Sequence, residues 1–193
     1  MKNMKNLLRS KTALSTVVTT LIILVVSVLL ASVVTFYAIN VTTTRTTEES
    51  MQMYKMHTWQ NGTNYAESAF LLVNTGGRDI VVDKITVRGQ ESPITSLYYN
   101  KTSDTISADL TYQTPNSAGT QIANTTVTVG SSSYTLIQGT TGSNLILPAG
   151  KSMIIYIVNP DHVSVNDIGV TLGLTMFTAD AQYYKECNVE ASS

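Results

Sequence analysis

The most constraining feature of this sequence is an uncharged stretch that runs from Thr12 to Thr44. Its central part, Val17–Ile39, is almost wholly apolar and is interrupted mainly by Thr, Ser and Ala. As a helix rising ~1.5 Å per residue, this part would be roughly 35 Å long, which exceeds the ~30 Å hydrocarbon core of a bilayer. Such a helix has to be buried in lipid or against other helices, because nothing else in the chain is long enough to cover it.

The charges beside this stretch predict its orientation. Lys2, Lys5, Arg9 and Lys11 precede it, and no acidic residue occurs before Glu48. Basic residues next to a membrane span remain in the cytoplasm. The chain after the helix is therefore predicted to lie outside the cell.

A small-residue site precedes the apolar run. A secretory signal peptide has a shorter run and is cleaved after it. Here the site is Lys11-Thr12-Ala13-Leu14, on the N-terminal side of the run. Cleavage after Ala13 would remove the basic residues and leave the apolar helix as the mature N-terminus.

This arrangement resembles the class III signal peptide of archaeal type IV pilins and archaellins over residues 9–40. Lys11 matches the third position before the cut, Ala13 the position immediately before it, and Leu14 the first mature residue. Bacterial pilins usually carry Glu as the fifth mature residue, where this chain has Val18. Archaeal members commonly lack that acid, so the archaeal branch is favoured. The resemblance implies cleavage by a prepilin peptidase, and then assembly of a membrane-inserted precursor into a helical homopolymer by a platform protein and an ATPase.

Three segments are expected along the chain: a cleaved basic leader over residues 1–13, the apolar helix over 14–58, and an extracellular β-domain over 59–193. The helix itself is predicted at Leu14–Met56. Thr42–Thr47 is rich in β-branched residues and should weaken it, whereas Glu48–Met56 returns to good helix formers.

From residue 65 onward the apolar pattern is typical of strands. Ser68–Val73 and Asp79–Arg88, joined by the Gly-rich turn at Asn74–Gly77, predict a β-hairpin. Residues 89–125 are expected to form an exposed excursion. The chain is therefore predicted to be α+β, a long helix followed by an antiparallel β-sandwich that resembles Ig-like and archaellin-like domains. Further strands are predicted at Thr126–Val129, Tyr134–Ile137, Ser152–Val158, Val170–Phe177 and Tyr183–Cys187.

Composition and motifs argue against several functions. After loss of the leader, eight basic residues face thirteen acidic ones, which disfavours nucleic acid as a partner. His57 and His162 are the only histidines and do not form a metal-ligand pattern. Cys187 is the only cysteine and belongs to no recognisable nucleophile motif. We expect no enzyme activity, no cofactor and no metal.

The helix carries small residues at four-residue spacing, Ser27, Ala31 and Thr35. Such a stripe lets neighbouring helix backbones approach closely, so we interpret it as a packing face. In a solitary membrane anchor the same stripe would be incidental. Four N-glycosylation sequons begin at Asn40, Asn61, Asn100 and Asn124, and the last two are favoured because they lie in the least patterned region.

These features together predict a structural subunit of an archaeal type IV pilus-like surface filament that serves adhesion. Two alternatives stay open. The chain can be an archaellin of a motility filament, or a monomeric single-span surface glycoprotein or binding receptor. The position of the mature N-terminus discriminates between the filament subunits and the monomeric anchor.

Overall fold

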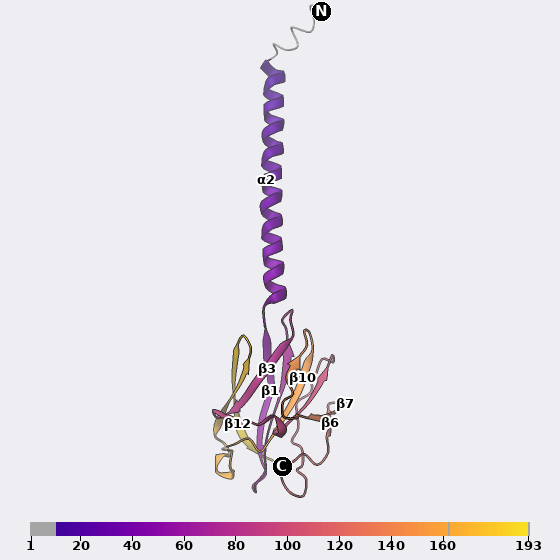
Figure 1. The fold of residues 1–193 in the computed structure, drawn as a ribbon, viewed down its shortest axis with the longest axis vertical. Coiled ribbons are helices and arrows are strands. Elements are labelled where there is room, and N and C mark those ends of the chain that lie inside the picture. Colours follow the sequence, from indigo (N-terminus) through magenta and orange to yellow (C-terminus); the bar gives the residue numbers. More distant parts are fainter. Residues whose placement is uncertain (1–10, 162, 193) are drawn as a thin grey trace, which may run out of the picture. The chain divides into compact units, whose positions relative to one another are not determined.

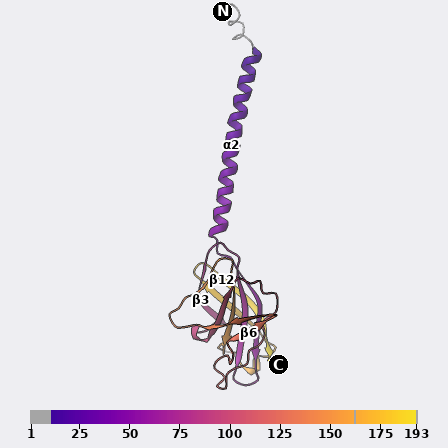
Figure 2. The same cartoon turned by 90° about the vertical axis from the view of Figure 1, so that its right-hand side faces the viewer.

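A computed structural model describes residues 11–161 and 163–192, and the chain divides into two compact units after Thr46. The first unit consists of the helix α2, Lys11–Thr47, which is continuous in both views (Figures 1 and 2). The second unit, called the outer domain below, is built almost entirely of strands. The fold is therefore α+β, as predicted.

The outer domain contains twelve described strands and two short 3-10 helices. The strands are β1 (Met51–Gln60), β2 (Ala66–Asn74), β3 (Ile80–Val87), β4 (Gln90–Glu91), β5 (Leu97–Thr102), β6 (Thr126–Val129), β7 (Ser132–Thr135), β8 (Ile137–Gln138), β9 (Leu145–Leu147), β10 (Ser152–Val158), β11 (Thr171–Thr178) and β12 (Gln182–Ala191). The 3-10 helices are η1 (Ile94–Ser96) and η2 (Val165–Asp167).

The helix ends earlier than the sequence predicted. It stops at Thr47, and Met51–Gln60 forms strand β1, so the boundary expected between residues 58 and 59 is wrong. Met51 and Met53 alternate with exposed neighbours and are buried in the core against β2. Packing on a sheet outweighs the helix propensity of these residues, because that propensity amounts to only a few tenths of a kcal/mol per residue.

Ten strands make one large sheet in the order β4-β3-β11-β12-β1-β2-β10-β5-β8, with β9 paired to β3. β1 and β12 run parallel, and the other described pairs are antiparallel. The sheet curls so that both halves contribute to one core. Phe70 of β2 and Ile155 of β10 lie in this core together with Ile85 of β3 and Met176 of β11.

A second core lies on the other face of β1, β2 and β10. Their side chains Trp59, Leu71 and Tyr156 are covered there by the segment 103–136, which supplies Leu110 and Val127. The β6–β7 hairpin belongs to this covering segment. β2 and β10 are therefore buried on both faces, which explains the continuous apolar runs Ala69–Val73 of β2 and Met153–Val158 of β10.

Two sequence predictions about the outer domain are corrected by this arrangement. Residues 89–125 are not simply an exposed excursion, because they contain β5 and part of the segment that closes the second core. β2 and β3 are not a hairpin either: β2 pairs with β1 and β10, whereas β3 pairs with β4, β9 and β11. The Asn74 side chain donates to the carbonyl oxygens of Arg78 and Leu147, which ties the turn to β9 and directs the chain toward the other half of the sheet.

Candidate assembly surface

The surface of α2 is the most unusual feature of the described chain. Every side chain from Leu14 to Thr44 is exposed, and seventeen large apolar residues lie between Leu14 and Ile39. They are distributed around the whole helix rather than along one stripe. By length and composition Leu14–Thr44 is able to cross a membrane. A helix that is apolar on all sides requires an apolar environment on all sides.

Many of the described hydroxyl groups in this helix form hydrogen bonds within it. Eight Ser and Thr side chains donate to a backbone carbonyl three or four residues earlier, at 2.7 to 2.9 Å. Thr35, for example, donates to the carbonyl oxygen of Ala31. In an apolar environment an unpaired hydroxyl is costly, so this back-bonding makes the polar residues compatible with lipid or with a helix bundle.

The structure places Ser27, Ala31 and Thr35 on one side of the helix, one turn apart. Ser27 donates its hydroxyl to the carbonyl oxygen of Ile23, so its polar atom also turns back onto the helix. All three side chains are smaller than the Leu, Ile and Val side chains of the same helix. A second helix can approach the backbone closely along such a line of small residues.

The residues assigned to leader cleavage lie in the first turns of α2. Leu14 is 69% exposed, and Lys11 and Ala13 belong to the same helix, with side chains outside the described part. The basic residues Lys2, Lys5 and Arg9 lie outside the described residues. The Ala13–Leu14 bond is thus in helical backbone next to an exposed apolar run.

The four sequon asparagines lie in different environments. Asn40 is in α2, Asn61 follows β1, Asn100 is in β5 and Asn124 precedes β6. Asn124 is exposed, whereas Asn100 is half-buried and donates its Nδ2 to the carbonyl oxygen of Thr135 at 2.7 Å. Asn61 Oδ1 accepts hydrogen bonds from the backbone and hydroxyl of Thr63. Of the two sequons favoured from the sequence, Asn124 therefore has the more accessible side-chain nitrogen, Nδ2.

Glu67 is a buried carboxyl that sequence reasoning did not single out. It lies on β2 in the second core and is 0% exposed. Its oxygens accept hydrogen bonds from the Tyr65 hydroxyl at 2.7 Å and from the Gln113 backbone at 3.3 Å. Burial raises its pKa to about 8, and the Tyr65 hydrogen bond partly opposes this shift. No described ion pair involves it. In the sequence, the only indication that Glu67 is buried is its position between Tyr65 and Ala69 on a strand that is mostly buried on both faces.

The described histidine and the cysteine occupy structural positions. His57 Nε2 lies 3.0 Å from Asp109 Oδ1, and its ring stacks on Trp59 with centroids 5.2 Å apart. Cys187 is half-buried, and burial raises the pKa of its thiol, which disfavours the nucleophilic thiolate. His162 lies outside the described residues. Within residues 11–161 and 163–192, no group of three His, Cys, Asp or Glu side chains is placed to hold a metal ion.

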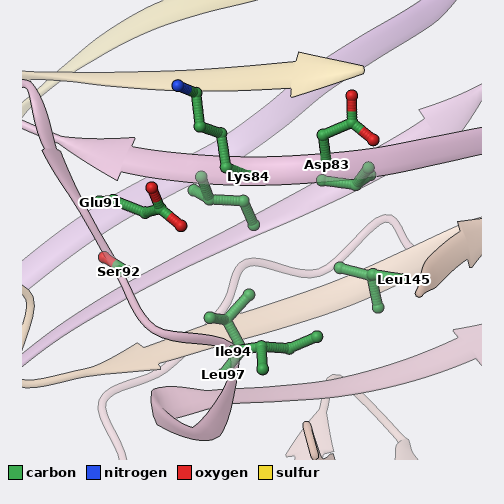
Figure 3. A pocket seen from close by; sticks show the side chains of 9 residues that line it. Asp83, Lys84, Glu91, Ser92, Ile94, Leu97 and Leu145 are labelled. Carbon is green, nitrogen blue, oxygen red and sulfur yellow. The ribbon is translucent and has the colours of Figure 1, made fainter. Parts of the chain in front are cut away.

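A small cavity of about 60 Å³ lies beside β3, between Ile85, Glu91 and Leu97 (Figure 3). Figure 3 shows that Asp83 and Lys84 point away from Ile94, Leu97 and Leu145. Lys84 instead lies over the ring of Phe177, 4.6 Å from its centroid. Ser92 also lines the cavity, and its buried Oγ has no protein partner among the described residues. The cavity is large enough for a few water molecules, which can satisfy this hydroxyl.

Comparisons with known proteins add little to this geometry. No family model matches the chain, and no curated protein matches its sequence. Among solved structures, the chain is similar to a copper-bound PCuAC domain from PmoF2, at 12% identity and a TM-score of 0.32. The similarity covers 75% of this chain and 98% of that domain. Similarity at this level carries no conclusion about the fold or the function of the chain.

Proposed function

We propose that this chain is a structural subunit of an archaeal type IV pilus-like surface filament, which polymerises through α2 and serves attachment to surfaces. The observation that carries the proposal is the fully exposed apolar surface of α2. Its seventeen large apolar side chains would each gain ~1.5–3 kcal/mol on full burial. Two environments can bury such a rod on all sides: a bilayer, and a bundle of the same helix from many subunits.

The basic leader provides a way to pass from the first environment to the second. Before cleavage, drawing the helix out of the membrane would carry Lys2, Lys5, Arg9 and Lys11 through lipid, at ~2.5–3.5 kcal/mol or more each. Removal of residues 1–13 by a prepilin peptidase leaves only the new amino group. The leader would thus retain the precursor in the membrane, and its loss would permit extraction by an assembly platform and its ATPase.

The outer domain would coat the filament. We propose that its curled sheet is related to Ig-like or archaellin-like sandwiches, because its two halves face each other across one core as two layers do. Glycan on exposed sequons such as Asn124 would protect that coat. The same architecture fits an archaellin, so motility is a second use of the same filament.

Electron microscopy tests the proposal. Filaments sheared from cells that express the chain should contain it as the main protein by mass spectrometry. An Ala13→Phe variant, which places a bulky side chain before the scissile bond, should yield membrane-bound precursor without filaments. A monodisperse single-span protein in the membrane, with no filament under any condition, would establish the monomeric anchor instead.

A further inference from the structure

The loop between β10 and β11 presents apolar side chains to solvent. Val165, Ile168 and Val170 are between 41% and 43% exposed, although they lie within six residues of one another. Apolar side chains that gather on a surface in this way mark an interaction site more often than single exposed ones do. Residues 163–170, called the loop below, are therefore a candidate contact surface.

This loop is held in a fixed conformation. The backbone and hydroxyl of Ser164 donate to Asp167 Oδ2 at 2.7 and 2.8 Å, and Arg88 pairs with Asp167 Oδ1 at 2.8 Å. These contacts, with the Ser164 backbone first, lower the pKa of Asp167 to about 2. The Gly169 backbone donates to the carbonyl oxygen of Val189 on β12. Because the loop is ordered in advance, binding through it loses little conformational entropy.

A groove of about 560 Å³ lies elsewhere on the outer domain, between β1, β2, β10 and the start of the covering segment. Leu71, Val73 and Ile106 supply its apolar lining, and Tyr54, which is 47% exposed, lies beside them. Partly exposed aromatic residues of this kind often anchor protein interfaces.

The groove and the loop carry opposite charge. Lys55 donates to the carbonyl oxygen of Ser107, and Lys151 donates to the Ser103 hydroxyl, so two ammonium groups lie over one wall of the groove. Asp104 lines the same groove, which leaves a net charge of +1. Asp161 is exposed close to the loop in the sequence, and Asp167 within the loop is neutralised by Arg88, which leaves a net charge of −1 among the described residues.

The two surfaces lie at opposite ends of the outer domain and cannot meet within one chain. The groove lies where β1 begins, because Ser152 pairs with Val73, which pairs with Gln52. The loop lies where β1 ends, since Gly169 is bonded to Val189, which pairs with Thr58. Figure 1 shows the two ends of β1 at opposite ends of this domain. A contact between two different surfaces of identical chains is heterologous, and such contacts build an open filament when the rotation between subunits does not close a ring.

We propose that the loop of residues 163–170 of one subunit, with the neighbouring Asp161, docks into the groove at Tyr54 and Ile106 of the next subunit. This proposal rests on the filament proposed above and names the contact between outer domains within it. Val165 and Ile168 enter the apolar part of the groove, and Asp161 faces Lys151. The contact joins neighbouring outer domains. The layer of outer domains therefore adds bending stiffness to the filament beyond that of the helical bundle.

Cysteine cross-linking in filaments tests the contact. The parent is a Cys187→Ser chain, and the test variant adds Val165→Cys and Ile106→Cys. Oxidised filaments of this variant should run as a ladder of covalent multimers on a non-reducing gel. A matched control replaces Ile106→Cys with Ile137→Cys, which is 59% exposed on β8 and outside the groove. That control should remain monomeric.

The outcomes separate the two proposals. Parent filaments that form normally while the test variant gives no ladder would overturn the docking contact and leave the filament intact. A parent that never forms filaments overturns the filament and the contact together. If the cysteine pair itself prevents assembly, charge reversal tests the contact instead. Asp161→Lys alone should shorten the filaments, and the double variant Asp161→Lys with Lys151→Glu should restore their length. Failure of the second change to restore length would overturn the contact.

Discussion

The Tyr65 hydroxyl donates a 2.7 Å hydrogen bond to Glu67 Oε2 inside the second core, where Tyr65 is 1% and Glu67 0% exposed. The carboxyl is also bonded to the Gln113 backbone of the covering segment, so it links β2 to the layer above it. The titratable groups that interact with it electrostatically are the phenols of Tyr65, Tyr112 and Tyr156. Ionisation of Glu67 would therefore place a negative charge in an aromatic core.

This pair makes stability depend on pH in a defined direction. The folded pKa of Glu67 is raised to about 8 from 4.5, so the folded chain keeps a proton that the unfolded chain releases. Stability from this group is fully present below about pH 4.5 and is lost as the pH rises to about 8. Glu67→Gln removes that dependence. As the pH rises from about 4.5 to about 8, the native chain should therefore lose up to a few kcal/mol of unfolding free energy that the Glu67→Gln variant keeps.

Denaturation of the full chain in detergent, followed by the fluorescence of Trp59, measures this effect at pH 5, 7 and 9. Trp59 is the only tryptophan and lies in the same core. Tyr65→Phe serves as the matched control, because loss of its hydrogen bond should raise the pKa of Glu67 further and extend the window upward. Equal pH dependence in Glu67→Gln and the native chain would contradict the assignment.

The turn at Gly76 should not tolerate a side chain. A Cβ at Gly76 would lie 2.7 Å from the Glu48 carbonyl oxygen and 2.8 Å from the Ser50 nitrogen, both backbone atoms. Gly76→Ala should therefore lower the free energy of unfolding by ~1–3 kcal/mol. Gly173→Ala is the comparison, since the three atoms nearest to its Cβ would all belong to the side chain of Tyr184, which is 59% exposed and can turn aside. Urea unfolding should show the larger loss for Gly76→Ala, and an equal or larger loss for Gly173→Ala would refute this account.

The small-residue stripe separates a helix bundle from a lipid anchor. Ala31→Leu keeps the helix apolar, so insertion into the membrane should be unchanged or slightly improved. In a packed bundle the added volume typically costs ~1–3 kcal/mol at each site, and every subunit repeats it. Filament yield relative to membrane-bound subunit should therefore fall for Ala31→Leu and stay near normal for the control Val25→Leu. Normal filaments from Ala31→Leu would show that Ser27, Ala31 and Thr35 are not the packing face.

Glycan occupancy should differ between the two favoured sequons. N-glycosylation joins the sugar to Asn Nδ2, and this atom of Asn100 donates to the Thr135 carbonyl oxygen within the β-domain. Asn124 is exposed and uses its Oδ1, which accepts from the Thr126 backbone. Glycopeptide mapping of native material should find Asn124 modified more fully than Asn100. Greater occupancy at Asn100, or bare asparagine at all four sequons, would count against this ranking.

The helix and several strands could be predicted because their patterns are local. The uncharged run fixes α2, and β10 was predicted at Ser152–Val158, where the structure has it. β1 could not be found in this way. Its Met and Lys residues are good helix formers, and one of its two neighbours in the sheet, β12, lies near the other end of the sequence. Its bulge at Tyr54–His57, where Lys55 has a φ of 52°, further disturbs the alternation.

The pairing of β3 and the burial of Glu67 could not be predicted for a related reason. A Gly-rich turn between two strand patterns favours a hairpin, but it does not exclude neighbours from elsewhere in the chain. Phe177 and Thr178 of β11 pair with Lys84 and Val82 of β3, so Asp83 is an extra residue in β3. Such a bulge shifts which residues of the strand face the core. The residues around Glu67 indicate a buried strand, but segment 103–136 completes the burial of its carboxyl, and that long-range contact has no local signature.

The mature N-terminus of the subunit in purified surface filaments is the most direct test of the central claim, that cleavage frees α2 to polymerise. Mass spectrometry of the N-terminal peptide should identify Leu14 as the first residue in every filament preparation. Membrane fractions should hold, in addition, the uncleaved precursor. A surface protein that retains Lys11 and the residues before it, or that begins after Asn40 and so lacks the apolar helix, would contradict the account.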